Sequence, residues 1–577
     1  MQTSCAVSSR HGRGIRLHPG PGEHAVRRAD LGSQQSHAQR RPVRKGDRAR
    51  CTTPSRAASN RGSSARHSSC MSNDPAERQA SGRAAAGSHP DRGGSVQSRR
   101  VVIVGGGFSA ACFALQLLRA ATFPVAISLI EPREHLGRGL AYSAADADHR
   151  LNAPLEGHVI DPDRPGELRE WVEGAGVLHS DEKCRSGGGH VFLRRRDFGA
   201  FLTDLLRREA SHARPGSSME HVRDLAVAVS RPDGAYRVVT SGGRRLEADL
   251  LVLATGNPEP SLRPPFLPEH AGHPGIIANP LEPGCLEAIP ADARVLVVGS
   301  GLTALDIVST LLRREHRAEL LVVSRRGLRP RPHAPHILGA AAPKGHRPPV
   351  VFDPPVPAFL RDEPLRIRAW SKALRREMRR CSAAGLPWQD SFDALRDAVF
   401  KIWPQLPVEE KNRFLRRLRV YYDAHRFRCP PMNDAGVRRA ESSGRVRFAA
   451  ATLLAVHPSA PDGGIRVEMK DTRSGEPAVR HFDWVVNCTG LDPGAGWRFN
   501  PFLNALADHG WLRLDPTGIG LHVGSHCEAL DAAGNPQPTL RAIGPPTAGV
   551  FGDPLGVPFI SGQIRRILPD VLRTLDC

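Results

Sequence analysis

Two short apolar runs, each followed directly by a glycine-rich turn, are the clearest feature of the hydrophobic pattern. Residues 101–104 read Val-Val-Ile-Val, and residues 295–298 read Val-Leu-Val-Val. Runs of this length that are rich in β-branched residues are typical of buried parallel strands. After the first turn, apolar residues continue with helical character as far as Leu118. The pattern therefore predicts two strand–turn–helix units of an α/β protein.

Both turns have the spacing G-x-G-x-x-A. Between a strand and a helix, the first glycine allows a tight turn and the second lets the backbone approach a pyrophosphate, which the helix N-terminus stabilises. A glycine-rich turn can also be only a turn, but the strand and helix supply the context that the dinucleotide fingerprint requires. The candidate cofactor-binding residues are Gly105, Gly107, Phe108, Ser109 and Ala110 in the first turn, and Gly299, Gly301, Leu302 and Thr303 in the second.

The two units differ at the end of their next strand. In the first unit, residues 125–130 lead to Glu131, whose carboxylate would accept hydrogen bonds from a ribose. In the second, the strand ends in Ser324, Arg325 and Arg326. Guanidinium groups suit a 2′-phosphate, because they are always charged and can bind its oxygens in pairs. The second unit is therefore expected to bind NADPH; the alternative is that these arginines form a solvated surface turn.

An apolar strand ending in Thr-Gly follows each unit. Thr255 and Gly256 end the first of these strands, and Thr489 and Gly490 end the second. A strand can end this way for structural reasons alone. Their placement, however, resembles flavoproteins with two dinucleotide-binding domains, in which such turns link the FAD and NAD(P)H domains.

The chain from Arg99 to near its C-terminus resembles a bacterial group of FAD/NAD(P)-binding oxidoreductases, mostly of unassigned substrate and related to flavin monooxygenases. The resemblance implies FAD in the first unit, with Asn152 and Gly544 among the cofactor contacts. Such proteins often carry Trp-Glu where this chain has Phe551-Gly552-Asp553, so no role of that glutamate is transferred. The matching segments are residues 137–142 (GRGLAY), 151–154 (LNAP), 324–327 (SRRG), 421–428 (YYDAHRFR), 543–546 (IGPP) and 557–559 (VPF).

This resemblance implies an α/β fold with two Rossmann-type dinucleotide-binding domains. The NAD(P)-binding domain is expected to be inserted in a discontinuous FAD domain, with a helical insertion at about residues 363–428. The expected boundaries are 99–260 for the first segment of the FAD domain, 261–290 for a linker, 291–490 for the NADPH domain and 491–577 for the second segment of the FAD domain.

The net charge of +21 does not indicate nucleic-acid binding. Residues 1–98 hold 17 Lys and Arg against 6 Asp and Glu, so about half of the excess lies there. This segment has no Phe, Trp or Tyr, and we expect it to be disordered. Two interpretations of this segment are equally good: the protein starts at Met71, or the segment is a functional basic arm. No apolar run is long enough to span a bilayer and no secretory signal is evident, so a cytoplasmic location is expected.

The redox chemistry is expected to come from FAD, which would take hydride from NADPH. No pattern identifies a catalytic side chain. The eleven cysteines include no C-x-x-C pair, which disfavours both a local disulfide couple and a zinc site. Three functions stay open: a flavin monooxygenase acting on a small-molecule substrate such as an amine, an NADPH-dependent reductase of an organic or protein acceptor, and a flavin-binding redox sensor.

Three further features have two interpretations each. His333 and His336 would contact the nicotinamide nucleotide or lie on the surface. Cys488, at a strand end, would pack as an apolar residue or take a redox role. The basic residues around His425 would form a substrate-binding strip or a solvated helix face.

Overall fold

The computed structural model describes residues 98–144, 146–342, 353–458, 464–491, 497, 500–553 and 555–577. The sequence predicts disorder for residues 1–98 and offers an alternative start at Met71. Apart from Ser98, the residues that these predictions concern lie outside the described part of the chain. All structural statements below concern the compact unit Asp91–Cys577.

The first sheet has six strands in the order β15-β16-β7-β1-β2-β3. β1 pairs in parallel with β2 on one side and with β7 on the other, and only β15 runs antiparallel to its neighbour. The outer strands β15 and β16 come from the C-terminal region of the chain, so this sheet is discontinuous in sequence. Its strands are β1 (Arg99–Val104), β2 (Val125–Ile130), β3 (Ser218–Val222), β7 (Leu250–Leu253), β15 (Glu528–Leu530) and β16 (Pro536–Ala542).

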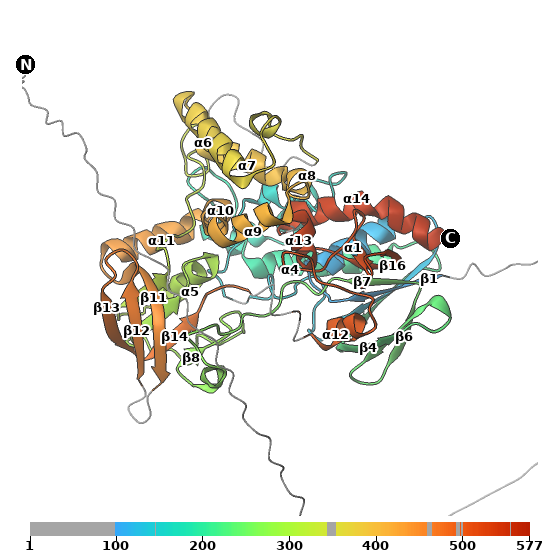
Figure 1. Cartoon of the computed structure of the whole chain (residues 1–577), viewed down its shortest axis with the longest axis horizontal. Helices are drawn as coiled ribbons and strands as arrows, with labels where there is room; N and C mark the ends of the chain where they lie inside the picture. Colours follow the sequence, from blue (N-terminus) through green and yellow to red (C-terminus); the bar gives the residue numbers. More distant parts are fainter. Residues whose placement is uncertain are drawn as a thin grey trace, which may run out of the picture. The chain divides into compact units, whose positions relative to one another are not determined.

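Helices cover this mostly parallel sheet. Helix α1 (Phe108–Ala120) lies beside the C-terminal helix α14 (Val557–Asp576) and beside α4 (Arg195–Ser211) (Figure 1). An antiparallel three-stranded sheet stands between β3 and β7 in sequence. The remaining elements of this unit are α2 (Glu167–Gly174), α3 (Val177–Ser180), β4 (Ala226–Ser230), β5 (Tyr236–Thr240), β6 (Arg245–Ala248), α12 (Pro501–Asp508) and α13 (Ala548–Phe551).

The second sheet has seven strands in the order β13-β12-β11-β10-β9-β14-β8. β9 lies between β10 and β14 and is parallel to both. Helices α5 (Leu302–Arg313) and α11 (Pro431–Ser442) pack together in this unit. The strands are β8 (Ile276–Ile277), β9 (Val295–Val298), β10 (Leu320–Ser324), β11 (Val446–Pro458), β12 (Ile465–Asp471), β13 (Pro477–Phe482) and β14 (Trp484–Asn487).

The fold class is confirmed: two parallel-strand α/β units, each with a β-turn-α start, and the second lying in sequence between the two segments of the first. One detail differs from the expected linker at 261–290. That segment contributes β8, which pairs in parallel with β14 at the edge of the second sheet. A two-residue strand has too few positions to show a period in the sequence.

Helices α6 to α10 fill the segment between β10 and α11 and carry an apolar cluster of their own that includes Trp370 and Ile402. The cluster reaches the C-terminal segment of the first unit, because Trp403 donates a hydrogen bond to the Gly549 carbonyl at 2.9 Å and Phe400 contacts Phe551. The helices are α6 (Ile367–Ala383), α7 (Trp388–Asp397), α8 (Val399–Ile402), α9 (Val408–Arg417) and α10 (Arg419–Arg426).

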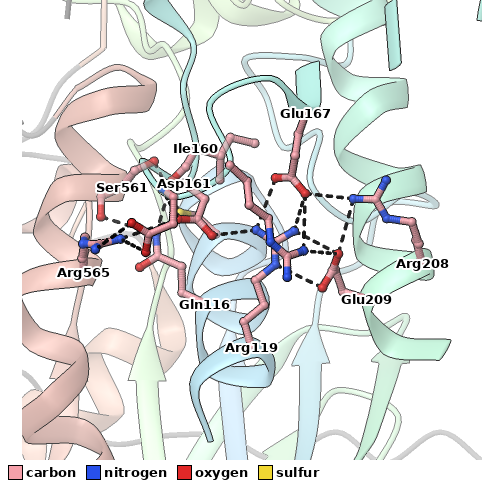
Figure 2. A network of polar contacts seen from close by, with 12 residues as sticks. Gln116, Arg119, Ile160, Asp161, Glu167, Arg208, Glu209, Ser561 and Arg565 are labelled. Atoms are coloured by element: carbon pink, nitrogen blue, oxygen red, sulfur yellow. Dashed lines mark hydrogen bonds and ion pairs between the residues drawn. The ribbon is translucent and has the colours of Figure 1, made fainter. Parts of the chain in front are cut away.

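A buried polar network fastens the end of α1 to the helices around it (Figure 2). The Arg119 guanidinium binds three carboxylates from three segments: Asp161 at 2.9 Å, Glu167 at 2.5 Å and Glu209 at 2.9 Å. The Arg119 side chain is 10% exposed. Glu167 and Glu209 also accept hydrogen bonds from Arg208 (Figure 2). Arg119 is therefore the shared partner of three carboxylates that would otherwise repel one another, and Arg208 adds a second positive charge beside Glu167 and Glu209.

Candidate functional site

The first glycine-rich turn joins β1 to α1 in a conformation that other residues cannot adopt. Gly105 has φ +106°, and a Cβ atom there would lie 2.3 Å from the carbonyl oxygen of Ala254. Its neighbour Gly106 donates its N–H to the Glu131 carboxylate at 2.8 Å. Glu131, at the end of β2, thus lies against the turn as the sequence pattern predicts. Oε1 already accepts from the Arg133 N–H at 3.1 Å and from the Arg133 guanidinium at 3.3 Å, so Oε2 is the carboxylate oxygen that keeps a lone pair for a further donor.

A second glycine pair widens the space in front of this turn. The Gly137 N–H donates to the Gly106 carbonyl at 2.8 Å, which holds the GRGLAY segment against the turn. At Gly139 a Cβ would lie 2.9 Å from the Gly107 Cα, and at Gly107 a Cβ would lie 3.5 Å from the Gly139 Cα. A Cβ at Gly139 would clash, whereas a Cβ at Gly107 would be in ordinary van der Waals contact, so the close approach requires a glycine at position 139. The result is a cradle of backbone at the N-terminus of α1, the arrangement that fits a pyrophosphate.

A first cavity of about 1290 Å³ opens at this cradle. The Thr255 hydroxyl is buried and has no hydrogen-bond partner among the described residues, which marks a polar atom that a ligand can satisfy. Of the predicted cofactor residues, those that line this cavity are Gly105, Gly107, Phe108, Ser109, Glu131, Thr255, Gly256 and, from the second turn, Thr303.

Two predicted residues lie behind the cavity wall. Ala110 is fully buried in the core beneath the sheet, so it serves helix–strand packing. Gly544 is also buried, and a Cβ there would lie 2.3 Å from the Ser109 hydroxyl. Its N–H donates to the Gln563 side chain at 2.8 Å. Gly544 therefore fixes the start of α1, while the next residue, Pro545, lines both cavities.

The second turn repeats the geometry of the first. Gly299 has φ +112°, and a Cβ there would lie 2.0 Å from the Cys488 carbonyl oxygen. Around Gly301 the space is open, with no described atom within 4 Å of a Cβ. The Ser300 hydroxyl donates to the Ser324 hydroxyl at 2.8 Å, which ties the turn to the end of β10.

A second cavity of about 1620 Å³ begins at this turn. Arg325 and Arg326 are exposed at its rim, and Arg326 donates to the Tyr421 hydroxyl at 2.8 Å. No described carboxylate forms an ion pair with either arginine. The predicted residues that line this cavity are Asn152, Gly299, Gly301, Leu302, Thr303, Ser324, Arg325, Arg326, Thr489 and Gly490.

Asn152 is the one predicted first-unit residue that lines the second cavity and not the first. The two cavities adjoin, since some of their wall residues are common to both. The shared residues are Ala141, Tyr142, Arg195, Asn257, Thr303, Leu491, Pro545, Leu555 and Gly556.

Cys488 lines the second cavity, but its thiol is buried. Burial, followed by the nearby Asp306 charge, holds the pKa of this thiol far above its usual range. A thiol that stays protonated is a poor nucleophile. The packing interpretation of Cys488 is therefore favoured over the redox one.

The basic residues at 426–428 are not a solvated strip. Arg426 bonds Asp553 at 3.0 Å and Arg428 bonds Asp393 at 2.7 Å, and both arginine side chains are buried. Burial raises the pKa of the Tyr422 hydroxyl, which donates to Asp553 at 3.1 Å. Sequence reasoning missed these groups, because the acidic partners lie 35 and 127 residues away.

One set of possible metal ligands occurs in the described residues, formed by His526, Glu528 and Asp570. The fully buried Arg541 guanidinium already bonds Asp570 at 2.7 Å and Glu528 at 3.4 Å. These carboxylates therefore have a cation.

Among the described helices, none combines the length and apolar character needed to cross a membrane.

Comparison with known proteins finds a family match in the N-terminal segment of the first unit. Residues 102–258 match the model of a family described as FAD-NAD(P)-binding. The span runs from β1 to just beyond the Thr255-Gly256 turn, and so covers the glycine-rich turn, Glu131 and the GRGLAY segment. These residues are a FAD-NAD(P)-binding domain, as expected. No curated protein matches the sequence.

Solved structures share the fold of most of the chain. The Kutzneria sp. 744 ornithine N-hydroxylase, with reduced FAD, NADP⁺ and L-ornithine, is 16% identical with a TM-score of 0.53, over 82% of this chain and 99% of that chain. L-lysine 6-monooxygenase from Pseudomonas syringae is 16% identical with a TM-score of 0.52, over 82% and 99%. The Erwinia amylovora cadaverine monooxygenase bound to FAD is 16% identical with a TM-score of 0.51, over 82% and 94%. At this identity the likeness is one of fold.

Proposed function

We propose that this protein, whose residues 102–258 are a FAD-NAD(P)-binding domain, is a flavin monooxygenase-like oxidoreductase that oxidises NADPH and acts on a small-molecule substrate. The observation that carries the proposal is the pair of adjoining cavities. Each begins at a G-x-G-x-x-A turn, and the two share wall residues such as Pro545 and Gly556. Two dinucleotides that start at these turns would extend toward a common junction.

The chain's own residues would bind and orient the two cofactors. The Gly107–Gly139 cradle and the N-terminus of α1 would hold the FAD pyrophosphate, and Glu131 would hold the adenosine ribose. Gly301 and the N-terminus of α5 would hold the second pyrophosphate. The bound cofactors would supply hydride transfer from nicotinamide to flavin. The helices α7 and α10 would cover the junction and limit access of water.

A monooxygenase fits better than a reductase of thiol substrates. The sequence has no C-x-x-C pair, and both Cys488 at the second cavity and Cys112 on α1 are buried with raised pKa values, about 12 for Cys112. The three solved structures described above are named as a hydroxylase and two monooxygenases of amino compounds. An amine is therefore the first substrate class to test.

The test of this function is product analysis with purified, FAD-loaded protein, NADPH and a panel of primary amines under O₂. We expect oxygen to enter one amine in proportion to the NADPH consumed. Reduction of an added organic acceptor under argon, with no oxygenated product under O₂, would instead identify a reductase.

The preference for NADPH depends on the two arginines at the end of β10. We expect Arg325→Ala and Arg326→Ala each to weaken NADPH use about ten-fold, because a charge-assisted hydrogen bond to the 2′-phosphate is lost. NADH use should hardly change. Steady-state kinetics with both cofactors, at low and high salt, measures the effect. Arg447→Ala is the control, since Arg447 bonds Glu319, which directly precedes β10 at the end opposite Arg325. Unchanged cofactor preference in both variants would make these arginines surface charges.

A further inference from the structure

One corner of the second cavity is built by three segments that are distant in sequence. His333 comes from the loop after β10, Gln389 from α7 and Arg428 from just after α10. Contacts hold them together: the Gln389 amide donates to the carbonyl of Pro332, the residue before His333, at 3.3 Å. The positive charge of Arg428 lies close enough to His333 to lower the pKa of its ring. We call these three residues the 333–389–428 corner.

His333 presents a hydrogen-bond acceptor to this corner. Its side chain is buried and packs edge-on against Phe192, which is contrary to the surface interpretation. Burial, with Arg428 second, lowers the pKa of the imidazole to about 3, so the ring is neutral. The Nε2 atom is buried with no hydrogen-bond partner in the described structure. A neutral ring carries one proton, so Nε2 accepts a hydrogen bond in the tautomer that is protonated at Nδ1.

Gln389 presents a second acceptor. The side chain is 3% exposed, and its Oε1 atom is buried without a partner among the described residues. The amide cannot be turned around to remove this defect, because its NH₂ group must face the Pro332 carbonyl. This unpartnered oxygen belongs to a residue that lines the second cavity.

Arg428 presents a donor. Its two terminal nitrogens bond the Asp393 carboxylate at 3.0 and 2.7 Å, while its Nε–H is buried without a described partner. Burial alone would raise the pKa of the Asp393 carboxyl, but Arg396 and Arg428 outweigh burial and hold this pKa well below its usual range. Arg396 also bonds Asp397. The buried charges of the corner are thus paired with each other and leave none over for an ion.

Buried polar atoms without partners are rare in folded proteins, and each costs free energy until a partner satisfies it. Here two acceptors and one donor of that kind line the same wall. We propose that the 333–389–428 corner binds an uncharged primary carboxamide. The carboxamide NH₂ supplies two donors, to His333 Nε2 and Gln389 Oε1, and its carbonyl accepts from Arg428 Nε. This inference rests on the proposed function for the identity of the cavity.

The carboxamide has two possible sources, the nicotinamide ring of NADP⁺ and a separate substrate. The first arm of the test compares NADP⁺ with its 3-acetylpyridine analogue, which keeps the carbonyl and replaces NH₂ by methyl. Calorimetry on FAD-loaded protein measures both dissociation constants. The second arm titrates benzamide and acetophenone, with and without saturating NADP⁺.

The variants are His333→Phe and Gln389→Met, which remove an acceptor and keep much of the volume. Gln405→Leu is the matched control, because Gln405 is an exposed glutamine outside the cavity. Circular dichroism and Tm establish whether each variant is folded. If one variant does not fold, the other alone still tests the inference.

The wild type should bind the carboxamide about ten-fold more tightly than its methyl ketone, in one arm or the other. Each variant should reduce that ratio toward one, and Gln405→Leu should leave it unchanged. Tighter binding of NADP⁺ than of its 3-acetylpyridine analogue identifies the nicotinamide as the ligand group. Tighter binding of benzamide than of acetophenone identifies a separate substrate. Equal binding of amide and ketone by the wild type in both arms would overturn the inference while FAD and NADP⁺ binding stand. Protein that binds neither dinucleotide contradicts the proposed function instead, and the benzamide arm then still decides on the corner.

Discussion

Gly107→Val is expected to give a folded protein that does not retain FAD. Gly107 has φ −77°, a conformation that other residues adopt freely, so the backbone is not strained. The new side chain would fill the space between Gly107 and Gly139, because a Cβ at position 107 lies 3.5 Å from the Gly139 Cα. A pyrophosphate and a valine cannot share that cradle. We expect the FAD dissociation constant to rise by about 100-fold or more, which is about 2.7 kcal/mol.

The second turn supplies the matched control for this variant. Gly301 has the same position in its motif and a similar φ of −79°, but faces the second cavity. Gly301→Val should keep FAD and lose NADPH binding, the reverse of Gly107→Val. Flavin absorbance after gel filtration and calorimetry with NADP⁺ measure the two affinities. Loss of FAD from both variants alike, or from neither, would contradict the assignment of one cofactor to each turn.

Arg119→Met is expected to destabilise the protein by about 3 kcal/mol at neutral pH. The substitution leaves Asp161, Glu167 and Glu209, each 11–13% exposed, without their shared cation. Removing one partner of a buried ion pair lowers the stability of the folded protein by more than the intact pair contributes to it, because an uncompensated buried charge stays behind. Urea unfolding measures the difference. Arg207→Met is the control, because its bond to Asp204 is exposed and surface pairs contribute at most about 1 kcal/mol.

The same network predicts a pH dependence. The hydrogen bond from Arg119 is the main cause that lowers the pKa of Glu209 below its unfolded value, against burial. The stabilisation is therefore complete above an unfolded pKa of about 4.3 and is lost as pH falls through the lower, folded pKa. In Arg119→Met the Glu209 carboxylate loses this hydrogen bond and protonates more easily, so the stability deficit of the variant should narrow on acidification to about pH 4. If the loss in free energy of unfolding is the same at neutral pH and at about pH 4, lost packing and not charge explains the destabilisation.

The local features of the fold were accessible from the sequence. A strand, its glycine turn and the start of a helix are encoded by neighbouring residues, and the acidic residue at the end of the next strand follows from β-α-β geometry. The structure places Glu131 at the end of β2 beside the first turn, and its hydrogen bond from Gly106 is a contact that the pattern did not specify. Gly299 likewise lies in the turn after β9, while the Ser300–Ser324 contact was not predicted.

The features that depend on distant partners were not accessible. Arg426 looks like a surface cation in the sequence, and only the tertiary fold brings Asp553 to it. His333 follows a Pro- and Arg-rich stretch with no apolar periodicity, yet α7 and Phe192 cover it. The Gly107–Gly139 approach is an intermediate case, because the GRG sequence was visible but its contact with the first turn was not. A single sequence carries no signal for such pairings.

We propose that the two turns hold FAD and NADPH so that NADPH reduces the flavin. Anaerobic stopped-flow mixing of the purified, FAD-loaded protein with NADPH, followed by the visible absorbance of the flavin, tests this reaction. We expect NADPH to bleach the flavin completely and NADH to do so more slowly, and we expect Gly301→Val to abolish the NADPH reaction while the flavin stays bound. A flavin that NADPH leaves oxidised in the wild type would show that the two turns do not serve this reaction.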